Sequence, residues 1–233
     1  MSSTYLVIGA SSGIGLRVTE KLLEENRGVI SLSRNAPSLQ NPNLQHYPCD
    51  VTDTDAEFPH INEPLSGLAY FPGSITLKPF KNLSKDDFLN DWQINFLGAT
   101  QAIKNYLPQL EMQDGSSIVL MSTLAVQQGM PFHTSIAAAK GALEGFTLAL
   151  AAELAPKVRV NAVAPSLTAT PLSEHLTQDP KKKEIFEKRH PLKRLGTTDD
   201  LAEGVLFLLS ERSSWMTGQV LHIDGGLSTL SSF

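Results

Sequence analysis

Short apolar runs alternate with longer amphipathic stretches along the whole 233-residue chain. Buried parallel strands have the form of short apolar runs, whereas a surface helix repeats its apolar residues every three to four positions. The runs that fit strands are 4–10, 28–34, 44–51, 66–71, 116–123, 158–165 and 219–226, and the stretches that fit helices are one ending near Glu25, 85–109, 134–155 and 199–211. Alternation of this kind produces a parallel sheet covered on both faces. The pattern therefore predicts an α/β fold, a doubly wound parallel sheet of about seven strands, in one domain over residues 1–233.

Local signals mark where some of these elements begin and end. Ser84 is predicted as the N-cap of the helix over 85–109, and Thr197 or Thr198 as the residue that opens the last helix. The segment 52–64 holds two prolines, so no full helix is expected there. Ligands of doubly wound sheets bind at the carboxyl ends of the strands, where the strand order reverses. The functional site is expected at that edge.

The composition narrows the class of protein. The net charge of −5 argues against a nucleic-acid partner, whose phosphates favour a basic protein face. Cys49 is the single cysteine, which excludes a disulfide within the chain and fits a reducing, cytoplasmic location. The sequence predicts no signal peptide, and no apolar run approaches the roughly 20 residues needed to cross a bilayer. We expect neither membrane binding nor a metal site.

The segment GASSGIG (9–15) directly follows the first predicted strand and begins the first helix. Gly9 permits a tight turn, Gly13 lets the backbone approach a pyrophosphate, and Gly15 lets the helix pack closely on the strand. Free N–H groups and a positive partial charge at the start of a helix favour phosphate binding. Glycines alone would indicate only a tight turn, but in this context the motif indicates a dinucleotide site.

The end of the second predicted strand carries Ser33 and Arg34. An NAD site usually has an acidic residue there, which binds the ribose 2′-hydroxyl. With no carboxylate at this position to repel a 2′-phosphate, Arg34 can pair with one, which favours NADP(H) over NAD(H). The alternative is that Arg34 is a solvated loop charge. Asp50 and Val51, after the third strand, are well placed for the adenine ring.

Several motifs together resemble the short-chain dehydrogenase/reductase family, in the family's order and over nearly the whole chain. They are GASSGIG (9–15), CDV (49–51), Asn95 in INFLGA, IVLMST (118–123), Lys140, VRVNAVAP (158–165), Thr170 and TGQVLHIDGG (217–226). The resemblance implies a Rossmann-like fold, a nicotinamide cofactor, hydride transfer with a small-molecule substrate, and usually a homodimer or homotetramer. It also implies cofactor contacts at Ser11, Ser12, Ile14, Gly73, Lys140, Pro165, Thr168 and Thr170.

The sequence differs from the family mainly at the active-site residues. The family's active site is typically Asn, Ser, Tyr and Lys, of which Asn95 and Lys140 match. The serine position is Thr123. The tyrosine position, four residues before the lysine, is Ile136, which cannot donate a proton. Two backbone motifs also differ, since the Asn-Asn-Ala-Gly of the family is replaced by YFPG (70–73) and its Pro-Gly by Pro165-Ser166.

The surviving residues keep roles that the resemblance implies. Lys140 lies one helical turn beyond Ile136 and would hold the nicotinamide ribose hydroxyls. Asn95 would hold the backbone and an ordered water beneath that lysine. Thr123 keeps a hydroxyl that can bond a substrate oxygen, although it is far too weak an acid to replace tyrosine. The alternative for Asn95 and Thr123 is a structural role, in which their side chains only satisfy the hydrogen bonds of buried polar groups near a strand end.

Other residues are candidates for the missing acid. His133 lies three residues before Ile136 and has a pKa suited to proton exchange near neutral pH; the alternative is a histidine that caps the helix or faces solvent. Tyr70 has the right chemistry but is expected to pack under the cofactor. The segment 181–190 lies where the family keeps a mobile lid, and its charges fit a solvated helix face better than a phosphate site.

Two functions follow from this combination. The first is an NADPH-dependent reductase with altered acid chemistry, because losing a general acid typically costs roughly 10²–10⁴-fold and need not abolish turnover. The second is a non-catalytic NADP(H)-binding protein with a structural or sensing role. For either one we predict a homo-oligomer, through apolar and small residues beyond the core-facing stripes of the helices over 85–109 and 134–155: Leu97, Ala102, Leu143, Phe146 and Leu150.

Overall fold

A single parallel sheet forms the centre of the computed structural model, which describes residues 3–53 and 57–230. Its strands are β1 (Thr4–Ile8), β2 (Gly28–Ser33), β3 (Leu44–Pro48), β4 (Gly67–Tyr70), β5 (Ser116–Met121), β6 (Val158–Pro165) and β7 (Val220–Ile223). They lie in the order β3-β2-β1-β4-β5-β6-β7, and every neighbouring pair is parallel. The order reverses between β1 and β4, which confirms the predicted doubly wound fold.

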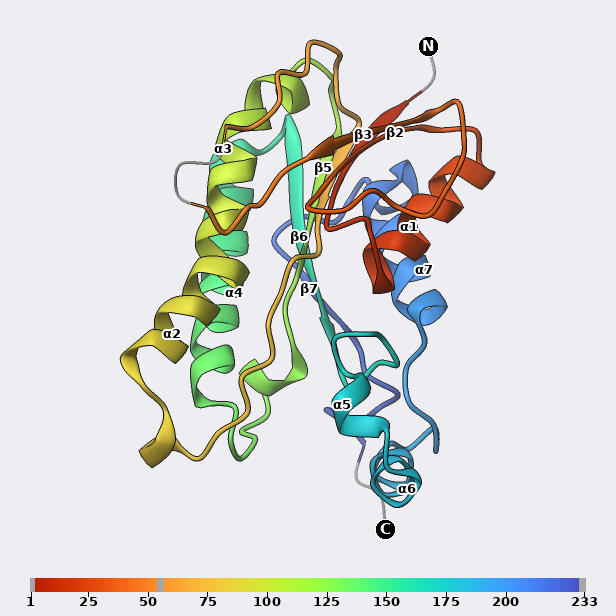
Figure 1. The fold of residues 1–233 in the computed structure, drawn as a ribbon. Helices are drawn as coiled ribbons and strands as arrows, with labels where there is room; N and C mark the ends of the chain where they lie inside the picture. The colour runs from red at the N-terminus through yellow and green to blue at the C-terminus, as the bar shows by residue number, and fades with distance from the viewer. Residues whose placement is uncertain (1–2, 54–56, 231–233) are drawn as a thin grey trace.

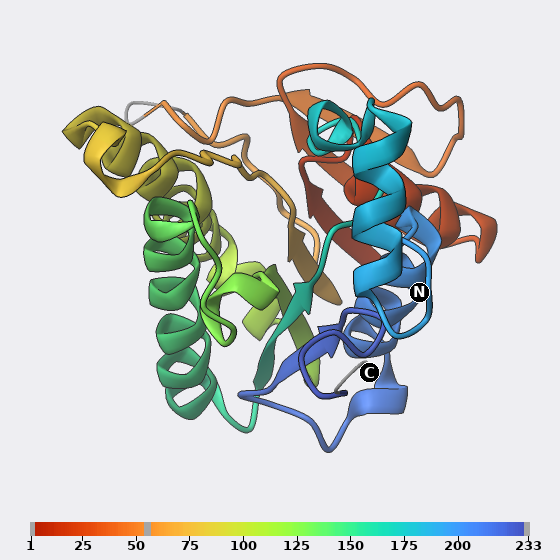
Figure 2. The same cartoon turned by 90° about the horizontal axis from the view of Figure 1, so that it is seen from below.

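Helices cover both faces of the sheet (Figures 1 and 2). One face carries α1 (Gly13–Glu24) and α7 (Thr198–Leu209), and the other carries α2 (Lys85–Trp92), α3 (Gly98–Glu111) and α4 (Thr134–Leu154). Two short helices, α5 (Glu174–Thr177) and α6 (Pro180–Arg189), lie beyond the end where β6 leaves the sheet. Short 3₁₀ turns occur at η1 (Phe80–Asn82), η3 (Leu124–Val126) and η4 (Glu211–Ser213).

The two helical layers enclose separate apolar cores. Successive side chains of a strand point to opposite faces, and β1 shows this directly. Leu6 and Ile8 belong to the core beneath α3 and α4, whereas Tyr5 and Val7 belong to the core beneath α1 and α7. A strand buried on both faces has no solvent side, which is why β1, β4 and β5 appear in the sequence as largely apolar runs.

The predicted helix over 85–109 consists of α2 and α3 joined by a π turn, η2 (Gln93–Leu97). A π turn inserts an extra residue into a helix and often lies at a functional site. Around it, the Tyr70 hydroxyl donates to the carbonyl oxygen of Ile94 at 2.7 Å, and the Asn95 amide donates to that of Asp91 at 2.9 Å. The turn therefore fixes Asn95, which is fully buried.

Several boundary predictions are confirmed. Ser84 caps α2 and Thr197 caps α7, each through a reciprocal capping box with the aspartate three residues later. The described parts of the proline-containing segment, 52–53 and 57–64, contain no helix. Helix α6 has no buried residue and carries i,i+4 pairs between Lys and Glu, as a solvated helix face should.

The predicted oligomer surface requires a correction. Ala102 and Leu143 are fully buried in this chain's own core, and Leu97, Phe146 and Leu150 are only partly exposed. The exposed apolar side chains of this layer are instead Leu89, Trp92 and Leu148. Helix periodicity did not separate these sets because α4 is apolar on most of its circumference.

The same composition gives α4 the length and hydropathy of a membrane-spanning helix, at 21 residues and a mean hydropathy of 1.2. In the fold it is packed against β6 and α2, so its apolar residues have a structural use within the domain.

Candidate active site

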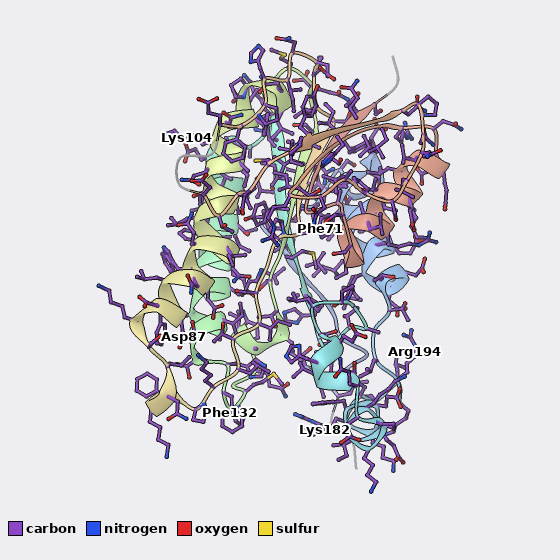
Figure 3. The ribbon with its side chains drawn as sticks, in the orientation of Figure 1. Phe71, Asp87, Lys104, Phe132, Lys182 and Arg194 are labelled. Carbon is purple, nitrogen blue, oxygen red and sulfur yellow. The ribbon has the colours of Figure 1, made fainter. Side chains whose placement is uncertain are left out.

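A cleft of about 860 Å³ opens at the carboxyl ends of the strands, near the reversal between β1 and β4. All of the residues predicted for the site line it: Gly9, Ser11, Ser12, Gly13, Ile14, Gly15, Ser33, Arg34, Asp50, Val51, Gly73, Asn95, Thr123, His133, Ile136, Lys140, Pro165, Thr168 and Thr170. In Figure 3, Phe71 marks the end of β4 near the middle of the molecule, while Phe132 and Lys182 lie toward the end that carries α6. The cleft lining includes Phe71 and Phe132 but not Lys182.

The glycine turn between β1 and α1 has a shape that side chains would fill. Gly9 and Gly13 have φ angles of +83° and +57°, which L-residues rarely adopt. A Cβ on Gly15 would lie 2.3 Å from the carbonyl oxygen of Gly9, so only glycine allows α1 to start this close to β1. A Cβ on Gly13 would lie 3.7 Å from Thr170 across the cleft. A pyrophosphate fits this cradle, next to the N-terminus of α1.

The part of the cleft near the ends of β2 and β3 is polar. Arg34 is exposed at the mouth of the cleft. Two hydrogen bonds from Thr52 hold the pKa of Asp50 below its usual range, and the nearby charge of Arg34 lowers this pKa further. Arg34 thus lies within electrostatic reach of one carboxylate, although that carboxylate is not at the position where an NAD site has its acid. Cationic Arg34 remains available to a phosphate.

Lys140 forms part of the floor at the centre of the cleft. Its ammonium group donates to the carbonyl oxygen of Met121 at 2.6 Å, which leaves two N–H bonds for a ligand. Burial lowers the pKa of Lys140 to about 7, and the negative charge of Asp91 opposes that shift. Gly73 lies alongside, because a Cβ there would be 3.9 Å from Nζ and 3.2 Å from Oδ1 of Asn95.

Asn95 is occupied by protein groups. Its amide nitrogen donates to Ser74 Oγ at 2.8 Å and to the Asp91 carbonyl oxygen at 2.9 Å, and its Oδ1 accepts from the Ser74 backbone at 3.4 Å. It therefore ties the π turn to the loop that follows β4.

The hydroxyl groups of Ser122 and Thr123, after β5, differ in whether their hydrogen is already donated to another protein group. Thr123 Oγ1 accepts from the backbone of Ala125 at 3.3 Å and caps the short turn η3, so its own hydrogen can still be donated into the cleft. Ser122 instead donates to Glu144 on α4, whose other oxygen accepts from Gln127. Of these two hydroxyls, Thr123 is the one suited to bond a ligand.

Ile136 is almost fully buried, with 4% of its surface exposed, and still borders the cleft. Apolar side chains from three further segments also line the cleft: Ile75 and Leu77, then Met130 and Phe132, then Leu172, Leu176 and Phe186. These segments give the cleft an apolar part.

The two candidate acids are placed very differently. His133 donates from Nδ1 to the carbonyl oxygen of Pro131 at 2.7 Å, which leaves Nε2 to exchange a proton on the cleft wall. Tyr70 was expected beneath the cofactor but is not on that wall. It is 1% exposed, and burial raises its pKa well above the usual range. Its hydroxyl serves the π turn, so Tyr70 is not a substitute acid.

The chain after β6 closes the opposite wall. Thr168 donates to the carbonyl oxygen of Ser166 at 3.1 Å, and the Thr170 hydroxyl lies 3.2 Å from that of Ser173. Both threonines therefore help to shape this loop beside Pro165.

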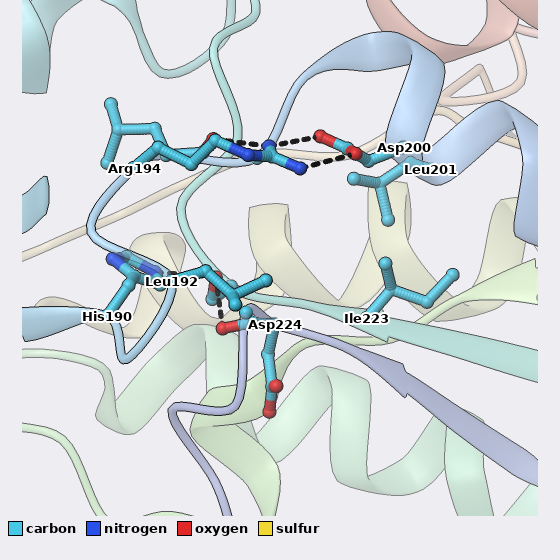
Figure 4. A pocket seen from close by; sticks show the side chains of 11 residues that line it. His190, Leu192, Arg194, Asp200, Leu201, Ile223 and Asp224 are labelled. Carbon is cyan, nitrogen blue, oxygen red and sulfur yellow. Dashed lines mark hydrogen bonds and ion pairs between the residues drawn. The ribbon is translucent and has the colours of Figure 1, made fainter. Parts of the chain in front are cut away.

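Sequence reasoning missed a buried histidine on this wall. His190 donates from Nδ1 to the carbonyl oxygen of Phe186 at 2.7 Å, so its Nε2, 2.8 Å from Ser166 Oγ, accepts from that hydroxyl when the ring is neutral. His190 also borders a small side cavity of about 100 Å³, where Arg194 pairs with Asp200 (Figure 4). The hydrogen bond between His190 and Ser166 connects the end of α6 to the loop after β6. The only sequence signal for this bond was the Pro165-Ser166 departure from the family.

Asp91 and Ser74 were also missed. Asp91 is completely buried on α2, and Ser74 Oγ and Thr76 Oγ1 donate to its Oδ1. A signal was present, because Asp91 precedes Asn95 by four residues, a spacing that places both on one side of a helix.

Comparison with known proteins agrees with this geometry. A family model described as enoyl-(acyl carrier protein) reductase matches residues 9–228. The 3-oxoacyl-[acyl-carrier-protein] reductase FabG of Thermotoga maritima is 34% identical, over 95% of this chain and 96% of its own length. L-xylulose reductase of Bos taurus is 30% identical, over 95% and 94% respectively.

Solved structures give the same result. A short-chain dehydrogenase family protein from Francisella tularensis matches with a TM-score of 0.90 at 27% identity, over 99% of this chain and 100% of its own. ElxO with NADP bound matches with a TM-score of 0.88 at 27% identity, over the same shares. The doubly wound sheet and its cleft are thus those of a Rossmann-like oxidoreductase. The chain belongs to the short-chain dehydrogenase/reductase family.

Proposed function

We propose that this protein is an NADPH-dependent reductase of a small, largely apolar molecule with an activated C=C or C=N bond. The observation that carries the proposal is Ile136, an apolar side chain at the family's tyrosine position, beside a retained Lys140 in an apolar cleft. An ordinary ketone needs a strong proton donor at its oxygen. A conjugated alkene or an imine tolerates the loss of that donor better, because water can protonate its reduced form.

The cofactor half of the cleft supports this proposal. The turn at Gly9 and Gly13 and the start of α1 would hold the pyrophosphate, Arg34 the 2′-phosphate, and Lys140 the nicotinamide ribose. When bound, the reduced nicotinamide supplies a hydride. The protein's contribution is to hold donor and acceptor together, which by itself supplies much of an enzymatic rate acceleration.

Turnover on a panel of ketones, imines and conjugated enones tests the proposal, with NADPH oxidation as the readout. We expect imines or enones to be reduced faster than ketones. Ile136→Tyr is expected to lower the best activity, because a tyrosine hydroxyl without a partner costs roughly 1–3 kcal/mol and the ring intrudes on the substrate. If Ile136→Tyr instead created ketone reduction where none existed, the protein would be a family member that had merely lost its chemistry.

His133→Ala decides the role of His133. A loss of turnover of about 100-fold or more, at unchanged NADPH affinity, would identify His133 as the acid. Tight NADPH binding without turnover on any substrate of the panel would replace the reductase proposal with the alternative, an NADP(H)-binding protein with a structural or sensing role.

A further inference from the structure

Lys140 and Asp91 are oppositely charged side chains buried in the same floor of the cleft. Lys140 is 6% exposed and Asp91 is 0% exposed. A buried charge is costly unless hydrogen bonds and an opposite charge compensate it. Asp91 is also in the last turn of α2, so the partial charge of a helix N-terminus does not stabilise it. The fold retains this carboxylate despite its cost.

The hydrogen bonds of Asp91 leave half of the carboxylate free. Oδ1 accepts from Ser74 Oγ at 2.5 Å and from Thr76 Oγ1 at 3.0 Å. Oδ2 is buried and accepts no hydrogen bond from the residues that the structure describes. Two neutral hydroxyls orient the group without neutralising it, so its negative charge acts on the surroundings.

Asp91 and the Lys140 ammonium group share neighbours in the floor of the cleft. Asn95 bonds both Asp91 and Ser74, and the missing side chain of Gly73 leaves a gap between Asn95 and Lys140 Nζ. Burial alone drives Lys140 toward the neutral amine, and the charge of Asp91 acts against this. The balance leaves the pKa of Lys140 at about 7, where a group can both hold and release a proton.

Several other charged groups on the elements around α4 bond other partners, and Lys85, Asp86 and Glu153 are exposed. Asp87 on α2 pairs with Lys78, and Glu144 on α4 accepts from Ser122 and Gln127. Arg159 on β6 donates to carbonyl oxygens at the end of α7. His133 precedes α4 and bonds Pro131. The turns η2 and η3 carry no ionisable side chain. Asp91 is the group whose charge supports that of Lys140.

We propose that Lys140 is the proton donor of the reduction and that Asp91 is the positioning residue that keeps it protonated at neutral pH. The inference rests on the proposed reductase function. Hydride addition to one atom of the substrate's double bond leaves an electron pair on the other. That atom takes a proton from Lys140 as the N–H bond breaks, and the resulting neutral amine regains a proton from water. Ile136 supplies no competing acid at the family's tyrosine position.

Asp91→Asn tests the proposal, because asparagine keeps the acceptor for Ser74 and Thr76 but removes the charge. In the cofactor-free protein, the titration of Lys140, followed by NMR of ¹³C-labelled lysine, should move to lower pH by about one unit or more. The alkaline limb of the pH–rate profile should move in the same direction by the same amount. Lys140→Arg, which stays charged throughout, should abolish that limb and reduce turnover by about 100-fold or more.

Asp86→Asn is the matched control. It makes the same charge change on the same helix at an exposed position, so both titrations should stay in place. An unmoved Lys140 titration in Asp91→Asn would overturn the role of Asp91. An alkaline limb that disappears in His133→Gln instead would assign the proton to His133. If no substrate of the panel is reduced, the reductase and the proton donor fail together, while the NMR titration still decides whether Asp91 controls Lys140.

Discussion

At the scale of single residues, the cleft combines retained cofactor-side groups with an altered chemical centre. We propose that Arg34 distinguishes the two nicotinamide cofactors by charge, so Arg34→Ala should weaken NADPH binding selectively. We expect a loss of about 1.5–3 kcal/mol, which is roughly 10- to 100-fold, with little change for NADH. Fluorescence titration of both cofactors measures it. Equal affinity of the wild type for NADPH and NADH would contradict the proposed role.

Lys140 makes the stability of the cofactor-free protein depend on pH. Its pKa in the fold is about 7, below the 10.5 of an ordinary lysine, so unfolding takes up a proton between these values. The folded state therefore gains stability as pH rises through that window. Lys140→Met removes this dependence. The increase in the free energy of unfolding that this variant produces should be larger at pH 6 than at pH 10 by on the order of 3 kcal/mol.

Urea denaturation at the two pH values measures this difference. Lys104→Met on α3 is the control, because Lys104 is exposed and points away from the protein (Figure 3). A Lys140→Met effect that is the same at both pH values would show that the lysine is not held in a desolvated site.

At the scale of elements, α7 depends on its first turn. Thr197 Oγ1 accepts from the backbone N–H of Asp200 at 3.2 Å, and Asp200 accepts from the Thr197 backbone at 2.8 Å. Thr197→Ala should lower the free energy of unfolding by about 1 kcal/mol, because the cap stabilises a helix that covers one of the two apolar cores. Thermal denaturation checks it against Thr198→Ala, which alters the first helical residue but leaves the capping box intact. Equal losses in the two variants would exclude the cap as the cause.

At the scale of the whole molecule, we predict a homo-oligomer formed through α2 and α4. Trp92 contacts Phe96 with tilted rings whose centroids are 4.7 Å apart, and Leu148 is 64% exposed on α4. Such apolar surface on a helical layer is typical of an interface. Leu148→Asp should weaken association by on the order of 100-fold or more.

Sedimentation equilibrium measures this association. Ile185→Asp makes the same kind of change on α6, away from this layer, and should leave the mass unchanged. A wild-type monomer at micromolar concentration would refute the prediction.

The sequence by itself determined the seven strands, the main helical segments, their order and the place of the cleft, but not the π turn that divides the segment 85–109. Strand and helix periodicities are local, the turn at Gly9 needs only its neighbours, and parallel strands bring their carboxyl ends to one edge, which is why residues as distant as Arg34 and Thr170 line one cleft. Only the tertiary structure decided which polar groups meet within it. The bonds of Asp91 to Ser74, of Ser166 to His190 and of Tyr70 to Ile94 join residues 17 to 24 positions apart in the chain. Local patterns carry no information on such pairs, because partners are set by how loops cross the sheet edge. The same limit explains why Ala102 and Leu143 were wrongly predicted to lie on an oligomer surface. Their burial depends on which side of an apolar helix faces the sheet.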